Sequence, residues 1–156
     1  MRGKQAPKRT FLPDAKYGSI EIARFINYVM VAGKKSIAQG IVYGALEAAE
    51  AKTTRKAMEV FEEAMKNITP QVEVRSQRVG GANYQVPMPV RPERRMALAY
   101  RWLIEAARKK KGRAMVEKLT EELVLASIGE GDAVKKKMDV HRMAEANRAF
   151  AHFARF

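Results

Sequence analysis

Apolar residues recur at intervals of three and four along most of the chain, which is the spacing of amphipathic helices. This spacing predicts six helices, at about residues 20–32, 36–51, 54–69, 92–111, 114–127 and 132–150. Ser19, Thr54 and Asp132 stand where N-caps are expected, and Ser36 with Gln39 has the spacing of a capping box. The apolar residues that the second helix is predicted to bury are Ile37, Ile41, Ala45 and Leu46.

Residues 72–90 interrupt the helical pattern and predict a β-hairpin between the third and fourth helices. Apolar and polar residues alternate on both sides of Gly80-Gly81, and these glycines can take the positive φ angles of a tight turn. Pro87 and Pro89 lack a backbone N–H, so they restrict the second strand to an edge. A lone hairpin is only marginally stable in water, so its outer half should project from the helices. The predicted fold is mainly α, a six-helix bundle with a protruding β-hairpin.

The composition limits the class of protein. With 156 residues, 47% of them hydrophobic, the chain is long enough for one domain with its own core. The absence of cysteine excludes disulfides, thiolate zinc sites and cysteine nucleophiles. No stretch reaches the length of a transmembrane helix, and the basic N-terminus lacks the apolar segment of a signal peptide. We expect a cytoplasmic protein with no membrane partner.

The residues that could support catalysis or metal binding are few. The two histidines, His141 and His152, match no metal-binding spacing. The run Gly33–Ser36 resembles the end of a phosphate-binding loop, but Tyr28 stands where the first glycine is needed and Lys35 where Ser or Thr is needed. No general base with an orienting partner is evident. We expect no enzymatic activity, no metal, no cofactor and no small-molecule substrate.

The net charge of +13 is concentrated in two segments. Residues 1–16 carry +4 and residues 72–113 carry +8, whereas residues 17–71 and 114–156 carry +1 and zero. A chain that is basic only for solubility does not need this uneven distribution of charge. A surface that binds a polyanion would produce it. Residues 1–18 contain two prolines and show no periodicity, so we interpret them as an extended basic arm.

Arginine dominates the second basic segment. Arg94, Arg101 and Arg108 are seven residues apart and form one stripe along the fourth helix. The other basic residues of this predicted surface are Arg75, Arg78, Arg91, Arg95, Lys109, Lys110, Lys111 and Arg113. Guanidinium groups grip phosphates bidentately and stack on exposed bases, so the expected ligand is a nucleic acid.

The hairpin favours RNA over DNA as that ligand. A projecting basic hairpin that carries Asn83, Tyr84 and Gln85 suits irregular RNA with splayed bases. No helix-turn-helix recognition helix with base-reading Asn or Gln is evident. The alternatives are a helical DNA-binding or nucleoid protein, and a protein that binds an acidic partner or a membrane surface.

Four blocks of sequence resemble the small-subunit ribosomal protein seven family, in its bacterial or organellar form. They are FLPDAKYGS, FINYVMVAGKKSIAQGIVYGALE, QRVGGANYQVPMPVRPERRMALAYRW and DAVKKKMDVHRMAEANRAFAHF, and together they follow the family order over essentially the whole chain. The resemblance implies a helical bundle with a protruding hairpin, in agreement with the pattern above. It also implies a primary rRNA-binding protein that acts without catalysis.

The resemblance further implies where such a protein lies and which residues it uses. It would bind the 3′ major domain of small-subunit (16S) rRNA, nucleate assembly of the subunit head, and lie at the subunit interface near the decoding centre and tRNA exit site. Its neighbours would be exit-site tRNA, mRNA and small-subunit ribosomal proteins nine and eleven. The further residues that would contact rRNA are Lys4, Lys8, Arg9, Lys34 and Lys35. The residues that would lie near tRNA or mRNA are Val79, Gly80, Gly81, Ala82, Asn83, Tyr84, Arg142, Arg148, Phe150 and Phe153.

Overall fold

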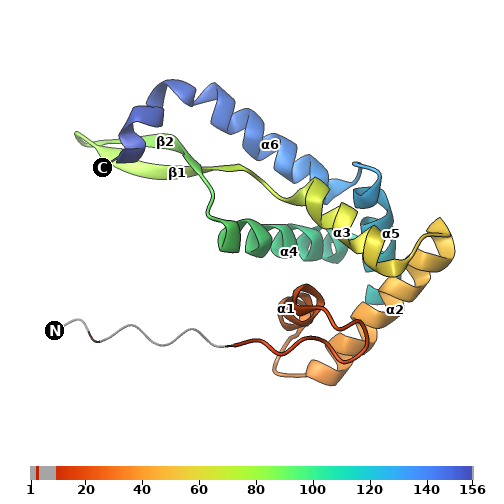
Figure 1. Ribbon diagram of the computed structural model, residues 1–156. Coiled ribbons are helices and arrows are strands. Elements are labelled where there is room, and N and C mark those ends of the chain that lie inside the picture. The colour runs from red at the N-terminus through yellow and green to blue at the C-terminus, as the bar shows by residue number, and fades with distance from the viewer. Residues whose placement is uncertain (1–2, 4–9, 156) are drawn as a thin grey trace.

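Six α-helices, one 3-10 helix and one β-hairpin make up the regular structure of the part that the computed structural model describes, residues 3 and 10–155 (Figure 1). In chain order the elements are α1 (Ile20–Val29), α2 (Lys35–Thr53), α3 (Ala57–Ile68), β1 (Val72–Val79), β2 (Ala82–Pro89), α4 (Pro92–Lys109), α5 (Met115–Ser127), α6 (Asp132–Ala146) and η1 (Arg148–Arg155). The expected mainly helical fold with an inserted hairpin is confirmed. The sixth helix is shorter than expected, because it stops at Ala146 and the chain continues as the separate helix η1.

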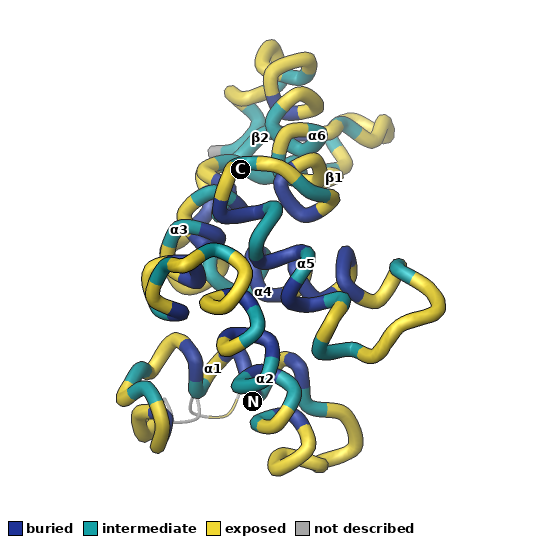
Figure 2. Tube along the Cα trace, turned by 90° about the vertical axis from the view of Figure 1, so that its right-hand side faces the viewer, coloured by how far each residue is buried: buried dark blue, intermediate teal, exposed yellow. Residues whose placement is uncertain are grey.

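The core is formed by the inward faces of α1 to α5. Leu46, Leu103 and Leu119 are completely buried at its centre. Phe25 of α1 packs its ring 5.6 Å from that of Phe61 and 5.5 Å from that of Tyr100. Figure 2 shows buried residues along the middle of the molecule, whereas the hairpin end is mostly exposed or half-buried. The helices therefore supply the stability, and the hairpin extends from them.

The face that α2 turns toward the core differs from the prediction. Ile37 is exposed and Ile41 half-buried, whereas Ala45 and Leu46 are buried as expected. The buried face is rich in small residues because α5 approaches closely: a Cβ on Gly44 would lie 3.3 Å from Val116 Cγ1. The spacing of large apolar residues therefore indicated the wrong edge of this helix.

Of the predicted helix starts, the one at Ser19 is confirmed and the one at Ser36 is wrong. The Ser19 hydroxyl oxygen accepts a backbone N–H from the first turn of α1 at 3.5 Å. By contrast, α2 begins at Lys35 with Lys34 in the cap position and no side-chain cap. The chain has already turned before Ser36, because the Lys34 N–H donates to the Val31 carbonyl at 3.1 Å.

Thr54 and Asp132 are not N-caps either. Thr54 ends α2 in a left-handed conformation (φ 54°), and α3 begins three residues later at Ala57. Asp132 is the first residue of α6, whose cap position is taken by a glycine. The N–H of Ala133 is satisfied from outside the helix, by the buried carboxylate of Glu122 at 2.9 Å. At α6, a tertiary contact has therefore replaced the local cap that the sequence predicted.

The hairpin has the predicted two-residue turn. Gly80 and Gly81 both have positive φ (57° and 92°), and the strands pair in continuous antiparallel register from Val72 opposite Pro89 to Val79 opposite Ala82. Both strands are edges of this two-stranded sheet, which accommodates the prolines of β2. In Figure 1, α6 lies along one side of the hairpin and η1 lies against β2. These helices support a hairpin that would be marginal alone.

Candidate nucleic-acid interface

The arginine stripe on α4 is on the surface of the protein. Arg94, Arg101 and Arg108 are all exposed, on a helix of 18 residues that is about 27 Å long. Arg91, in the cap position, is exposed as well, and its carbonyl accepts the backbone N–H groups of Arg94 and Arg95 at 3.0 Å. The guanidinium groups of Arg91 and Arg108 form no ion pair or hydrogen bond with another described residue. Glu105, also exposed, lies between the last two arginines and lowers the local charge. The stripe presents guanidinium groups over much of the helix length.

Two of the predicted arginines also hold the hairpin to α4. Arg94 Nε lies 2.7 Å and 2.9 Å from the two carboxylate oxygens of Glu73 on β1. Arg95 is half-buried, and its Nε donates to the Val90 carbonyl at 2.8 Å. These bonds hold the hairpin in a fixed orientation relative to α4. The two side chains therefore stabilise the structure in addition to any contact with an anion.

The basic residues at the C-terminal end of α4 fall into two groups. Lys110 turns its ammonium inward, 3.1 Å from Glu122 and 3.5 Å from Glu121, and Arg113 pairs with Glu121 at 3.3 Å. The second group consists of Arg108, Lys109 and Lys111, which are exposed. The exposed group is better placed to meet a phosphate, since Lys110 and Arg113 already have carboxylate partners.

The two arginines of β1 are not on the same face of the hairpin. Successive side chains of a strand point to opposite faces, so Arg75 and Arg78, three positions apart in an unbroken register, lie on opposite faces. Both are exposed. The turn residues Gly80, Gly81, Ala82 and Asn83 are exposed too, and Val79 is half-buried. The outer hairpin can therefore present charge on both sides.

Tyr84 belongs to an aromatic cluster that joins the hairpin to the C-terminal helix. Its ring lies 5.1 Å from that of Phe150 and 5.3 Å from that of Phe153, and the two phenylalanine rings are stacked at 6.3 Å with an interplanar angle of 11°. His152 contacts Phe153 at 4.0 Å. Three residues that the sequence placed near tRNA or mRNA are thus brought together, and they fix η1 against β2.

Replacing both Phe150 and Phe153 by alanine should release η1 from the hairpin. Each aromatic pair contributes about 0.5–1.5 kcal/mol, so the amides of β2 near Tyr84 should exchange with solvent at least tenfold faster. Hydrogen exchange followed by mass spectrometry measures this, with His152→Ala as the control because His152 contacts only one ring of the cluster. Unchanged exchange in the double variant would contradict the supporting role.

The remaining predicted arginines, those of the C-terminal region, are highly exposed. Arg142 on α6 and Arg148 at the start of η1 each leave 81% of the side chain exposed. Each lies near an acid one turn back, Asp139 at 3.9 Å and Glu145 at 3.6 Å. Exposed pairs of this kind are worth little, so both guanidinium groups can leave them for a stronger anion.

Lys34 and Lys35 lie at the N-terminus of α2, where the helix dipole disfavours cations. Both are exposed, and the first turn of the helix contains no acid. Stability of α2 therefore does not explain these lysines. Backbone N–H groups and ammonium groups at this end together favour an anion such as phosphate.

Lys35→Glu is therefore expected to change stability and RNA affinity in opposite directions. It should raise the free energy of unfolding by about 1 kcal/mol, because an acid replaces a cation at the helix N-terminus, and weaken RNA binding about tenfold. Chemical denaturation and filter binding measure the two effects. Lys52→Glu, in the last turn of α2, is the matched control: it makes the same charge change but should lower stability and leave RNA binding unchanged.

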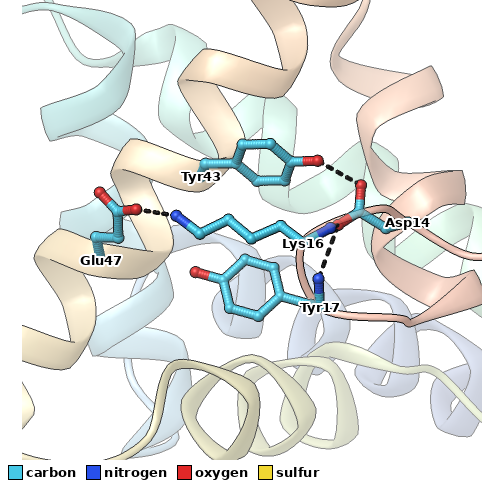
Figure 3. Close-up of polar contacts among 5 residues, drawn as sticks. All are labelled: Asp14, Lys16, Tyr17, Tyr43 and Glu47. Carbon is cyan, nitrogen blue, oxygen red and sulfur yellow. Dashed lines mark hydrogen bonds and ion pairs between the residues drawn. The ribbon is translucent and has the colours of Figure 1, made fainter.

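The arm meets the domain at a cluster of five residues, Asp14, Lys16, Tyr17, Tyr43 and Glu47, which we call the arm clasp (Figure 3). The buried Asp14 carboxylate accepts the N–H groups of Lys16 and Tyr17, both at 3.1 Å, and the Tyr43 hydroxyl at 2.6 Å. The Lys16 ammonium pairs with Glu47 and lies 5.6 Å and 5.3 Å from the rings of Tyr17 and Tyr43. The clasp holds the base of the arm on α2.

The protonation states of the clasp follow from these bonds. Burial alone would raise the pKa of Asp14, but the hydrogen bonds from Tyr43 and the two backbone N–H groups outweigh it and lower the pKa. The same hydrogen bond to Asp14, with burial, raises the pKa of Tyr43 to about 12. At neutral pH the carboxylate is therefore charged and the phenol protonated, as the clasp requires. Lys4, Lys8 and Arg9 lie outside the described residues.

A pocket beside α4 contains residues that the sequence pattern did not indicate as functional. It lies among the arm, α1 and α4, and the overlooked residues that line it are Phe11, Arg24, Asn27 and Tyr28. The sequence does contain a pattern that could have indicated two of them. Arg24 and Tyr28 are four residues apart, so they share one face of α1, opposite the predicted apolar stripe. Their significance depends on α4, which is distant in sequence.

Within the described part of the chain, no helix is long and apolar enough to cross a membrane. The same residues contain no group of three or more His, Cys, Asp or Glu placed to hold a metal ion. The described surface does carry exposed arginine and lysine side chains, which can bind anions.

Comparison with known proteins identifies the family. The model of the family described as ribosomal protein S7p/S5e matches residues 1–148. The chain belongs to this family. Its members are structural proteins of the ribosome, so the family is not one of enzymes.

Individual relatives agree with the family match over nearly the whole chain. The small ribosomal subunit protein uS7 of Methylibium petroleiphilum is 55% identical over 152 residues, which are 97% of this chain and 97% of the relative. The proteins of the same name from Neisseria meningitidis and Bordetella petrii are each 58% identical, with the same coverage of both chains. The resemblance to the small-subunit ribosomal protein seven family is confirmed, and the protein is a small-subunit member of the S7p/S5e family.

Proposed function

We propose that this protein binds small-subunit rRNA through the surface formed by the hairpin, the exposed face of α4 and the arm, and so serves as a structural component of the small ribosomal subunit in the cytoplasm. The whole-chain similarity to small-subunit proteins carries this proposal. The concentration of charge supports it, since residues 72–113 alone carry a net +8. The described and undescribed parts of the chain would act together as one RNA-binding domain.

The finer assignment follows from family membership. The protein would bind the 3′ major domain of the rRNA, nucleate assembly of the subunit head and lie at the subunit interface near the decoding centre and the tRNA exit site. The hairpin tip and η1 would lie near exit-site tRNA and mRNA, and ribosomal proteins nine and eleven would be neighbours. The exposed arginines at the far end of the molecule, Arg142 and Arg148, support a nucleic acid near η1.

Binding would proceed without catalysis. Arginine and lysine neutralise phosphates and release condensed counterions, so affinity falls steeply as salt rises. The deep major groove of A-form RNA is too narrow for side chains, so specificity comes from RNA shape and from unstacked bases. The arm clasp and the aromatic cluster of Tyr84, Phe150 and Phe153 lower the cost of ordering the arm and hairpin, because they hold the base of one and the side of the other.

Competition between RNA and DNA tests this function against the DNA-binding alternative. A transcript of the 3′ major domain should bind the full chain at moderate salt, and duplex DNA of equal length should displace it only at a large excess. Equal displacement by duplex DNA would favour a helical DNA-binding protein. Failure of the transcript to bind at low salt would overturn the function proposed here.

A further inference from the structure

A pocket of about 480 Å³ opens among the arm, α1 and α4, within the range of about 300–1,000 Å³ typical of small-molecule sites. Its lining includes Phe11 from the arm, Arg24, Asn27 and Tyr28 from α1, and Met96 and Tyr100 from α4. The three elements come from separate parts of the sequence, and Figure 1 shows α1 and the described part of the arm on the same side of α4. The pocket adjoins the arginine stripe, because Arg101 of the stripe lies over the Tyr28 ring at 6.0 Å.

Two of the three aromatic residues that line this pocket are exposed. Phe11 is 44% exposed and Tyr28 is 37% exposed, whereas Tyr100, which forms the floor 5.3 Å from the Tyr28 ring, is buried. Arg24 covers the Phe11 ring at 4.9 Å. Guanidinium and aromatic planes arranged in this way are the surfaces on which unpaired bases stack.

We propose that this pocket receives one unstacked nucleobase of the bound RNA. The proposal rests on the proposed function, because it requires that RNA lie along α4. The base would stack on Phe11 and Tyr28, and Asn27, whose amide can both donate and accept, would bond its edge. Arg24 and Arg101 at the rim would hold the phosphates on either side of the base.

The lining selects a base rather than a phosphate. It is largely apolar, and it includes the acidic residue Glu93, whose charge disfavours a phosphate. Each of the two arginines lies over an aromatic ring, Arg24 over Phe11 and Arg101 over Tyr28. A pocket for a free phosphate would need cations without such partners and no acid.

The arm supplies variants that separate stacking from simple apolar contact. Phe11→Leu keeps an apolar side chain of similar size but removes the aromatic ring. Phe11→Tyr keeps the aromatic ring. Leu12→Ala is the matched control, because Leu12 is the next residue of the arm, is 84% exposed and does not line the pocket. None of these residues is buried in the core, so all variants should fold.

The test combines affinity with chemical probing of the bases in a transcript of the 3′ major domain. Phe11→Leu should weaken binding about tenfold, the loss expected for one stacked base, and Phe11→Tyr and Leu12→Ala should bind as the unaltered protein does. One unpaired base of the transcript should be protected from dimethyl sulfate or a carbodiimide by the unaltered protein and should regain reactivity with Phe11→Leu. Asn27→Ala should expose the same base.

The outcomes distinguish this proposal from the proposed function. If the unaltered protein binds the transcript but Phe11→Leu binds equally well and no base changes reactivity, the pocket proposal is wrong while the function stands. If loss of protection occurs equally with Leu12→Ala, the arm as a whole and not the pocket holds the base, which also overturns the proposal. If the unaltered protein does not bind the transcript, both fail.

Discussion

Simultaneous replacement of Arg91, Arg101 and Arg108 by alanine is expected to weaken binding to small-subunit rRNA about 100-fold or more and to leave the helical content unchanged. The three side chains are exposed, and the guanidinium groups of Arg91 and Arg108 form no ion pair or hydrogen bond with another described residue. Arg101 lies over the Tyr28 ring at 6.0 Å, a surface contact whose loss should not unfold the helices. Each phosphate contact that is lost removes about 1 kcal/mol or more. Arg94 and Arg95 are kept because they also hold the hairpin.

The salt dependence gives a second readout of the same variant. Each lost phosphate contact should reduce the slope of log affinity against log salt by nearly one, so the triple variant should lower it by about two to three. Filter binding at several salt concentrations measures the slope, and circular dichroism checks the helices. An affinity loss with an unchanged slope would mean that the arginines act by some route other than phosphate neutralisation.

A charge-matched control excludes a general effect of net charge. Replacement of Lys52, Arg55 and Lys56 by alanine also removes three positive charges, but at the junction of α2 and α3. This replacement removes an exposed ion pair between Arg55 and Glu63. This control should keep its affinity and slope. If it lost affinity as the α4 variant does, the binding surface would not be the one along α4.

Elements whose structure is set by neighbouring residues were predictable from the sequence. The hairpin turn needs positive φ at two successive positions, and Gly80-Gly81 supplies them without help from the rest of the fold. Pro92, predicted at the first position of the fourth helix, occupies that position in α4. The charge of this surface could also be predicted. Arg94, Arg101 and Arg108 are spaced along the face opposite the apolar stripe, so they had to be exposed.

Features that depend on distant contacts were not predictable. Asp132 has the right chemistry for an N-cap, but Gly131 takes the cap position of α6, and the Glu122 carboxylate of α5 accepts the Ala133 N–H. The spacing of charges could not show that Lys110 turns inward to Glu122, or that Arg95 bonds the Val90 carbonyl. The pocket beside α4 was missed for the same reason, because the arm, α1 and α4 meet only in the fold.

Gly131→Ala is expected to lower the free energy of unfolding by about 4 kcal/mol, a large share of the stability of an ordinary domain. Gly131 precedes α6 with φ 94° and ψ 169°, a region that is essentially reserved for glycine and costs other residues about 1–3 kcal/mol. An added Cβ would also lie 2.8 Å from Glu122 Oε1 and 3.2 Å from Leu125 Cβ. Neither atom can move easily, because Glu122 is completely buried and the Cβ of Leu125 is attached directly to the backbone of α5.

Displacement of the Glu122 carboxylate is the second cause of the expected loss of stability in Gly131→Ala. Glu122 Oε1 accepts the Ala133 N–H at 2.9 Å, and its other oxygen lies 3.1 Å from the Lys110 ammonium. Moving the carboxylate would leave buried polar groups unpaired at the start of α6, at about 1–3 kcal/mol. Gly131 is therefore required both for its backbone angles and for the space that the Glu122 side chain occupies.

Gly129→Ala separates these two causes. Gly129 also has positive φ (84°), but an added Cβ there would meet no atom within 4 Å, so this variant should lose only about 1 kcal/mol. Urea denaturation of both variants, with unchanged m-values, measures the difference. In a Glu122→Ala background the loss caused by Gly131→Ala should shrink toward that of Gly129→Ala, because the clashing carboxylate is gone. Equal losses at positions 129 and 131 in the unaltered background would show that the buried carboxylate does not constrain this turn.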